Sequence, residues 1–360
     1  MGRLRTVAKD GTLIAEYRYD PEGTGTRTYE KNALRGITGR NFSYSDEDHL
    51  LTAGAATYQY DTDGFILSKT FGTEVTQYEY STRGELLSVS LPDGRTIEYL
   101  YDPLSRRTAR LVNGTVVEKY LWQGLTKLIA VYDSSDSLLM RFEYADGRMP
   151  VAMSKNASTY YLNFNQVGTL KAIADSTGNV VKSIEYDSFG NIINDSNPAF
   201  EVPFAFAGGL HDRDTGLIRF GYRGYDPDIG RWTAKDPILF EGGDTDLYGY
   251  CLNDPVNALD PVGFGPLGAT TDLTIAAAIE AAKLSRIIAL PLTIITAPIG
   301  DLIDPASTSD YGDRMMDAIL EAEAENGRMK KQFDEVKASL KDIHEILKNK
   351  KRLRDNACAR

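Results

Sequence analysis

A short motif with two tyrosines, Tyr-x-Tyr-Asp, returns along the first half of the chain and limits its fold more than any other feature. Residues two apart in a strand point to the same face, so each copy places two rings on one side. The Asp begins a turn, and a Gly three residues later supplies positive φ. Each unit is therefore expected to be one hairpin with an aromatic face. Copies lie at Tyr17–Asp20, Tyr58–Asp61, Tyr78–Ser81 and Tyr99–Asp102, with looser copies at Phe142–Ala145 and Ile184–Asp187, and the Gly follows at Gly23, Gly64, Gly84 and Gly190.

These units must lie side by side, because a single hairpin is only marginally stable in water. In the clearest run, the second tyrosine advances by 20 and then 21 residues, from Tyr60 to Tyr80 to Tyr101. We expect the rings to pack as ladders in a sheet. The alternative is that they remain exposed and act as stacking platforms for sugars.

Composition supports short strands and excludes several other classes. The 360 residues include 21 Tyr and 32 Gly but only 3 His and 2 Cys, which is typical of strands joined by tight turns. Cys251 and Cys358 form no Cys-x-x-Cys pair, so zinc-ribbon and disulfide-rich scaffolds are excluded. The net charge of −11 argues against a nucleic-acid surface on residues 1–264, because phosphate binding requires a basic face.

No pattern in the sequence predicts a cofactor or a metal ion. The Asp-x-Asp pairs at Asp212 with Asp214 and at Asp244 with Asp246 have the right ligand type for calcium. The full EF-hand pattern is missing, however, and such pairs in loops are usually turns. The N-terminus has no apolar segment and therefore carries no secretory signal, and it starts inside an expected strand. We therefore expect a segment of a longer polypeptide.

The amino-acid composition changes near residue 200, where Gly and Asp-Pro become frequent. Asp or Asn before Pro favours a turn and disfavours helix, so this stretch is predicted to be dense in loops. Its motifs are Arg223-Gly-Tyr-Asp-Pro227, Gly230-Arg-Trp232, Asp236-Pro237, Tyr248-Gly-Tyr250, Asn253-Asp-Pro255 and Asp260-Pro-Val-Gly263.

After residue 264 the composition becomes helical. Residues 310–355 place acidic side chains early and basic side chains late, which suits the helix dipole, and they include a short heptad-like seam. Residues 273–303 are apolar but contain Pro and charged residues. They are predicted to be either a buried helical hairpin or a membrane-active segment next to a basic tail. The predicted domains are thus 1–200 (repeats), 201–264 (loop-dense) and 265–360 (mostly helical).

The ordered motifs between Gly209 and Gly263, together with the Tyr-Asp repeats, closely resemble the Rhs/YD-repeat proteins and their Rhs repeat-associated core domain. The resemblance covers roughly residues 10–264 and does not extend to the last 96 residues. It implies a mainly β fold in which stacked hairpins wind into a hollow shell, with the core domain at its C-terminal end. In such proteins the variable segment after the core is often a polymorphic toxin.

The resemblance also implies an activity, because in several members the core domain is an intramolecular aspartyl protease that cuts after an Asp-Pro-x-Gly-Leu motif. Carried over position by position, the catalytic residues would be Asp236 and Asp260. The basic residue before the first Asp is Lys235, where Arg is usual. The bond cut would be Phe264–Gly265, with Phe where Leu is usual. Lys lacks the bidentate fork of Arg, which matters if this cation orients a carboxylate.

The proposed chemistry is physically reasonable. Two carboxylates in one site cannot both ionise cheaply, so one keeps a proton and acts as acid while the other acts as base on water. The chain supplies its own scissile bond at high effective concentration. The structural alternative for each Asp is a turn formed with the following Pro; for Asp226 and Asp254 we favour that turn, and for Asp236 with Asp260 both interpretations stand.

Three hypotheses follow for the function. The first is a shell scaffold that presents or releases residues 265–360; the second adds self-cleavage after Phe264; the third is a cell-surface adhesion or carbohydrate-binding module without catalysis. The expected partners are upstream Rhs repeats or a longer Rhs protein, an immunity protein for the C-terminal region, and a membrane contacted by residues 273–303. The expected location is secreted or at the cell surface, as part of an exported system.

Overall fold

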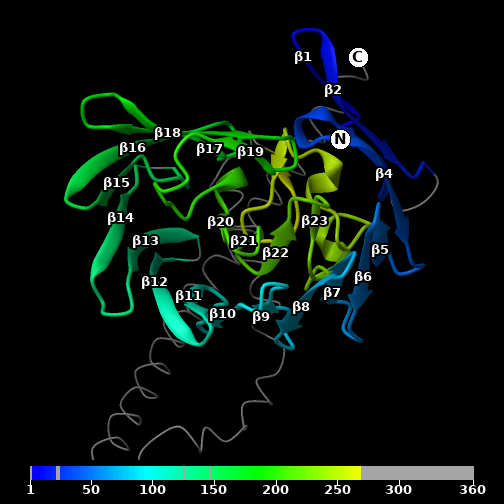
Figure 1. Ribbon diagram of the computed structural model, residues 1–360, viewed down its shortest axis with the longest axis horizontal. Helices are drawn as coiled ribbons and strands as arrows, with labels where there is room; N and C mark the ends of the chain where they lie inside the picture. Colours follow the sequence, from blue (N-terminus) through cyan, green and yellow to red (C-terminus); the bar gives the residue numbers. More distant parts are fainter. Residues whose placement is uncertain (1, 22–24, 125, 146, 269–360) are drawn as a thin grey trace, which may run out of the picture. The chain divides into compact units, whose positions relative to one another are not determined.

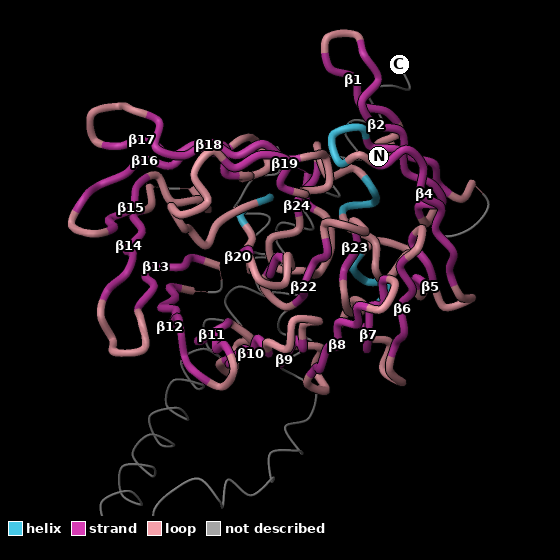
Figure 2. The backbone as a smooth tube through the Cα atoms, in the orientation of Figure 1, coloured by secondary structure: helices cyan, strands magenta, loops and turns pink. Residues whose placement is uncertain are grey.

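The computed structural model describes residues 2–21, 25–124, 126–145 and 147–268, and this part is built from short antiparallel strands and tight turns (Figures 1 and 2). The mainly β fold predicted from the repeats is confirmed. The helices predicted within 265–360, including the apolar segment 273–303, lie outside the described residues, which end at 268.

Nineteen strands form one sheet in which each strand pairs antiparallel with the next along the chain. The first ten strands are β1 (Thr6–Lys9), β2 (Thr12–Tyr19), β3 (Arg27–Asn32), β4 (Ile37–Tyr44), β5 (Leu50–Ala53), β6 (Ala56–Tyr60), β7 (Ile66–Phe71), β8 (Glu74–Tyr80), β9 (Leu86–Ser90) and β10 (Thr96–Tyr101). The remaining nine are β11 (Arg107–Val112), β12 (Thr115–Gln123), β13 (Lys127–Tyr132), β14 (Leu138–Glu143), β15 (Ala152–Lys155), β16 (Ser158–Phe164), β17 (Leu170–Asp175), β18 (Val180–Tyr186) and β19 (Ile192–Asp195).

The turns that end in Gly64, Gly84 and Gly190 have the geometry that the sequence predicts. The Oδ1 atom of Asp61 accepts the backbone N–H of Asp63 at 2.9 Å and that of Phe65 at 2.8 Å, and Gly64 has φ +81°. Gly84 and Gly190 also have positive φ, at +79° and +93°. A glycine carries no Cβ and adopts this conformation at little cost, so the repeated Gly fixes where each strand reverses.

The repeat tyrosines pack against the inner side of the sheet. Tyr17, Tyr58 and Tyr99 are between 2% and 4% exposed. The ring of Tyr17 meets that of Phe189 edge to face at 5.0 Å, and the guanidinium of Arg107 lies 3.7 Å from the ring centre of Tyr99. The rings therefore form the packing ladders that we expected, with cations and aromatic rings as neighbours.

The loop-dense segment lies on this inner side, and the sheet runs around it from β1 to β19 (Figure 1). It contains a second, four-stranded sheet and a small two-stranded one. Its strands are β20 (Leu210–His211), β21 (Ile218–Phe220), β22 (Arg223–Asp226), β23 (Arg231–Trp232), β24 (Ala258–Leu259) and β25 (Leu267–Gly268), and the 3₁₀ turns of the described part are η1 (Ala33–Arg35), η2 (Phe206–Gly208), η3 (Leu239–Gly242) and η4 (Cys251–Asn253).

Aromatic hydroxyls join this segment to the turns of the large sheet. Tyr248 donates its hydroxyl to the carbonyl of Gly64 at 2.6 Å, and Tyr225 donates to that of Phe189 at 2.7 Å. Both tyrosines are fully buried, as is Trp232 beside them. Hydrogen bonds to the turns of several repeats thus fix the loop-dense segment in place, including the residues that follow β23 and β24.

Candidate functional site

The structure brings the two predicted aspartates together on one guanidinium. Asp236 follows β23, Asp260 follows β24, and Arg223 begins β22. The Nη2 atom of Arg223 lies 2.9 Å from Oδ2 of Asp236 and 3.3 Å from Oδ2 of Asp260. All three side chains are buried, with at most 7% of their surface exposed. Two carboxylates and one arginine therefore share a site from which most water is excluded.

Arg223 is held from other sides as well. Its guanidinium lies 4.2 Å from the ring centre of Trp232, and its Nη1 donates to the carbonyl of Leu247 at 3.3 Å. The planar fork can thus reach two acceptors while its face stacks on an indole, which an ammonium group cannot do. Sequence reasoning gave this residue no role. The available signal was its place as the first, charged residue of the Arg-Gly-Tyr-Asp-Pro motif.

Asp260 accepts hydrogen bonds from backbone N–H groups on both sides of the Phe264–Gly265 bond, which the sequence predicts to be cut. Its Oδ1 accepts the N–H groups of Gly263 at 2.8 Å and Phe264 at 3.1 Å, and its Oδ2 accepts that of Gly265 at 2.8 Å. The nitrogen of Gly265 is the atom that would leave when Phe264–Gly265 breaks. Burial raises the pKa of Asp260 above the usual range of a carboxyl, although Arg223 and the three N–H groups act in the opposite direction. A proton on Asp260 is thus easier to retain than on an exposed Asp.

Gly242 lies on the other side of that bond. A Cβ on this residue would lie 2.7 Å from Oδ2 of Asp236 and 3.1 Å from the carbonyl oxygen of Phe264. A Cβ on Gly265, whose φ is +136°, would overlap the carbonyl oxygen of Gly242. The missing side chains let the loop after Asp260 pass directly over η3 and leave room between a carboxylate and the Phe264 carbonyl.

Phe264 itself is anchored in the core, with 1% of its surface exposed. Its ring stacks on that of Tyr222, with centres 4.5 Å apart and planes at 27°. The strands on either side pair with each other, Leu259 opposite Leu267 and Ala258 opposite Gly268. The Phe264–Gly265 bond therefore lies in a short, tightly bound loop.

Lys235, the predicted cation, lies near Gly64 and His49. Its Cδ lies 3.5 Å from the position of a Cβ on Gly64, and its charge contributes, after burial, to lowering the pKa of His49. The cation that contacts both aspartates is Arg223. The structure thus brings together Asp236, Asp260, Phe264 and Gly265 of the predicted set, and puts Lys235 beside the turn that precedes β7.

Gly242 offers a test of the space at this site. Gly242→Ala would place a methyl group between Asp236 and the Phe264 carbonyl, so we expect any cleavage at Phe264–Gly265 to slow at least about tenfold. Gly147→Ala is the matched control, because a Cβ there has no atom within 4 Å. Timed intact-mass measurements on both variants give the rates. Equal rates for Gly242→Ala and the unchanged chain would contradict this role for the space.

Three of the four aspartates in the Asp-x-Asp pairs bind arginines in the structure. Asp212 receives Nε of Arg110 at 2.7 Å, and Asp214 also contacts Arg110. Asp246 accepts both Nη atoms of Arg231, at 2.6 and 2.8 Å. In the described residues, no three His, Cys, Asp or Glu side chains lie close enough together to hold a metal ion.

Asp226 and Asp254 make short-range contacts that are typical of turns. The Oδ1 of Asp226 accepts the N–H of Asp228 at 2.9 Å, and Asp254 accepts Nδ2 of Asn257 at 2.9 and 3.1 Å. Neither contact involves the loop at Phe264. In the part of the chain from 2 to 268 that is described, none of the helices has the length and hydropathy needed to cross a membrane.

Asp244 gives a prediction on pH and stability. Burial raises its pKa from 3.8 to about 6, with a further contribution from the charge of Asp246. The pKa of Asp244 is higher in the folded chain than in the unfolded chain. Its contribution to the stability of the fold is therefore complete below pH 3.8 and is lost as the pH rises through 6. Asp244→Asn removes this loss, so we expect it to stabilise the fold by about 1–2 kcal/mol at pH 8 and by less at pH 5. Urea unfolding at both pH values measures the difference, and a gain that does not depend on pH would contradict the assignment.

Comparison with known proteins identifies the family of this scaffold. The family model described as Teneurin YD-shell matches residues 1–256. Teneurin-3 of Danio rerio is 31% identical over 276 residues, which cover 72% of this chain and 10% of that protein. Teneurin-m of Drosophila melanogaster is 30% identical over 263 residues, covering 71% of this chain and 9% of that protein. The chain thus spans about a tenth of the length of these relatives.

Solved structures with similarity to this chain come from toxin complexes. A crystal structure of TcdB2-TccC3-TEV aligns with 71% of this chain and 14% of its own, at a TM-score of 0.43 and 20% identity. The Photorhabdus luminescens Tc holotoxin pore aligns with 73% of this chain and 17% of its own, at a TM-score of 0.41 and 17% identity. Since the family model covers more than half of the residues, this chain belongs to the teneurin YD-shell family, whose Tyr-Asp repeats form a YD/Rhs-type shell scaffold.

Proposed function

We propose that this shell protein cuts its own chain between Phe264 and Gly265 and so ends the covalent connection of residues 265–360 to the scaffold. One observation carries the proposal: Oδ2 of Asp260 is 2.8 Å from the nitrogen of Gly265, the leaving atom of that bond. A general acid must be within hydrogen-bond reach of the atom that it protonates. The sharing of Arg223 by Asp260 and Asp236 supports the proposal further, because it puts a second carboxylate in the same site.

In the proposed reaction, Asp236 acts as base and Asp260 as acid. Asp236 takes a proton from a water molecule, whose oxygen attacks the carbonyl carbon of Phe264. In the uncut chain the N–H of Gly265 donates to Oδ2 of Asp260. Attack on the carbonyl carbon frees the lone pair of that nitrogen, and Asp260 then gives its proton to it as the C–N bond breaks. The products are a carboxyl group on Phe264 and an amino group on Gly265, so one water is consumed for each bond cut. The reaction leaves Asp236 protonated and Asp260 ionised, and the pKa values of the two carboxyls belong to the pair.

The proposal gives each part of the chain a role. Residues 1–200 form the repeat scaffold, residues 201–264 are the core domain that cuts, and residues 265–360 are the variable segment that is released. We place this protein outside the cell or at its surface, with a longer shell protein as partner. An immunity protein and a membrane contact by residues 273–303 remain predictions for the released segment.

The alternative function, an adhesion or carbohydrate-binding module, gains no support from the repeat tyrosines. The rings of Tyr17, Tyr58 and Tyr99 are buried and cannot offer a free face to a sugar. Self-cleavage is therefore the function that the geometry of the described residues supports better.

The decisive experiment is a timed measurement of intact mass on the purified full chain of 39.8 kDa. We expect two products whose masses add to that of the chain plus one water, with the new ends at Phe264 and Gly265. Because a contaminating protease would also cut, the measurement is repeated at several dilutions. A rate independent of concentration supports cleavage within one chain. A chain that stays whole would contradict self-cleavage and leave the scaffold role standing.

A further inference from the structure

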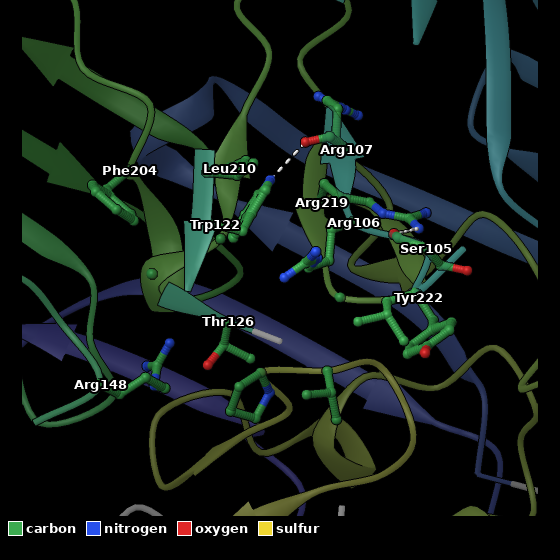
Figure 3. Close-up of a pocket in the computed structure, with 16 residues that line it drawn as sticks. Ser105, Arg106, Arg107, Trp122, Thr126, Arg148, Phe204, Leu210, Arg219 and Tyr222 are labelled. Atoms are coloured by element: carbon green, nitrogen blue, oxygen red, sulfur yellow. Dashed lines mark hydrogen bonds between the residues drawn. The ribbon is translucent and has the colours of Figure 1, made fainter. Parts of the chain in front are cut away.

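A cavity beside the start of β11 is lined by four arginines, and none of the sixteen described residues around it is acidic (Figure 3). Arg106 comes from the turn between β10 and β11, Arg107 is the first residue of β11, Arg148 lies in the loop after β14, and Arg219 lies in β21. The whole chain, by contrast, has a net charge of −11. The lining of this cavity is therefore strongly positive in a chain that is negative overall.

Several buried polar atoms at this cavity have no hydrogen-bond partner among the described residues. They are Oγ of Ser105, Nε of Arg107, and both Nε and Nη1 of Arg219. Ser105 is 2% exposed, and the two arginines are each 5% exposed. The remaining Nη2 of Arg219 donates to the carbonyl of Ser105 at 3.3 Å (Figure 3). Buried donors are nearly always paired in native proteins, so unpaired donors gathered at one cavity indicate a missing acceptor.

The charges are also uncompensated. In the described part of the chain, Arg107, Arg148 and Arg219 form no ion pair with a carboxylate. Arg107 and Arg219 instead stack on Tyr99 and Tyr101, at 3.7 and 4.9 Å from the ring centres. Burial lowers the pKa of Arg219 and the nearby charge of Arg107 lowers it further, although Tyr101 and Glu85 act in the opposite direction. Guanidinium groups stay charged at neutral pH, so an anion in the cavity would offset both burial and repulsion.

Ser105 adds a backbone observation. It occupies the position at which the turns after Asp61 and Ser81 have a glycine, and it has the same positive φ, +59°. This conformation disfavours a residue with a Cβ by roughly 1 kcal/mol, which glycine would avoid. In exchange, the serine puts a hydroxyl donor at the wall of the cavity.

We propose that this cavity binds a small tetrahedral oxyanion of the phosphate or sulfate class. Arg107, Arg219 and the hydroxyl of Ser105 supply donors from the buried wall, and Arg106 and Arg148 add positive charge to the lining. Donors that approach from separate elements match four oxygens better than the two of a planar carboxylate. Arg106 keeps its own partner, Asp102, at 2.6 Å, and its side chain is 24% exposed. The proposal does not depend on self-cleavage.

Calorimetric titration of the full chain with inorganic phosphate tests the site, in a chloride buffer at constant ionic strength. We expect one saturable site, and a loss of affinity of at least about tenfold in Arg219→Gln, because a buried charge-assisted hydrogen bond is removed. Arg95→Gln is the matched control, since Arg95 pairs with Asp93 and Asp214 and does not line the cavity. A second titration with phenyl phosphate distinguishes a free ion from the phosphoryl group of a larger molecule.

Ser105→Gly keeps the proposal testable if Arg219→Gln does not fold, because glycine suits the backbone at this position. We expect this variant to be at least as stable as the unchanged chain and to bind phosphate several-fold more weakly. Absence of phosphate binding by the unchanged chain would overturn the proposal. Equal binding by the unchanged chain and Ser105→Gly, or equal losses in Arg219→Gln and Arg95→Gln, would overturn it as well.

Discussion

Asp260→Asn is expected to keep the chain whole at Phe264–Gly265, with a loss of cleavage rate of about 10²–10⁴-fold. The carboxamide can still accept the N–H groups of Gly263 and Phe264 through its oxygen, but it has no proton to give to the nitrogen of Gly265. Asp236→Asn removes the proposed base and should have an effect of the same order. Intact mass against time, for both variants and the unchanged chain, measures the three rates.

Asp244→Asn is the control for these two variants. It makes the same change of one carboxylate to an amide, in the loop between η3 and Tyr248, without contact to the Phe264 loop. We expect it to cut at the rate of the unchanged chain. Loss of cleavage in all three variants would point to a general effect on folding, and cleavage by Asp260→Asn at the normal rate would contradict the assignment of the acid.

The rate of cleavage should also depend on pH in a defined direction. Asp260 must hold a proton to act as acid, and burial raises its pKa above the usual range for Asp. Cleavage should therefore continue at a pH where an ordinary carboxyl has lost its proton, and it should decline as the pH rises through the folded pKa.

Arg223→Met is expected to have the largest effect on stability, a loss of about 3–5 kcal/mol in the free energy of unfolding. Arg223 is 3% exposed and is the cation shared by Asp236 and Asp260, so its removal leaves two buried carboxylates without their shared cation. Urea unfolding measures the loss. Arg95→Met, at an arginine whose side chain is 40% exposed, should change stability by less than about 1 kcal/mol.

A double variant separates charge from packing. In Arg223→Met with Asp236→Asn, one of the two carboxylates is neutral, and we expect about 1–3 kcal/mol of the loss to be regained. If the losses in the free energy of unfolding caused by Arg223→Met and by Asp236→Asn simply add in the double variant, the two groups do not interact, and the shared site is refuted.

The fold could be predicted from local patterns. Alternating Tyr residues give a strand face, and Asp61 with Gly64 gives a turn, so a few residues decide each hairpin. The pairing of each strand with its neighbour needs no long-range information either. The mainly β fold and the Tyr-Asp turns were therefore accessible from the sequence.

The candidate site was accessible only in part, because its contacts join residues that are far apart in sequence. Arg223 precedes Asp260 by 37 positions, and their contact depends on how the four-stranded sheet with β22 and the two-stranded sheet with β24 pack against each other. No spacing rule connects them. The resemblance pointed to Lys235 as the cation because it precedes Asp236, whereas the cation that contacts both aspartates in the structure is Arg223. Gly242 was missed because its contribution is the absence of a side chain.

Because β24 and β25 lie on either side of the Phe264–Gly265 bond and pair with each other, cleavage of the bond and dissociation of the C-terminal piece would be two separate events. A broken bond between Phe264 and Gly265 would leave Leu259 opposite Leu267 and Ala258 opposite Gly268, so the two pieces would remain a noncovalent complex. The lifetime of that complex would be set by an off-rate, which depends on temperature, denaturant and force in ways that the chemical step does not. A denaturing assay would then report a nicked chain while a native assay still reports one particle. In such a protein, hydrolysis would remove the covalent connection to the C-terminal segment, and a later separation of β24 from β25 by force or heat would release that segment.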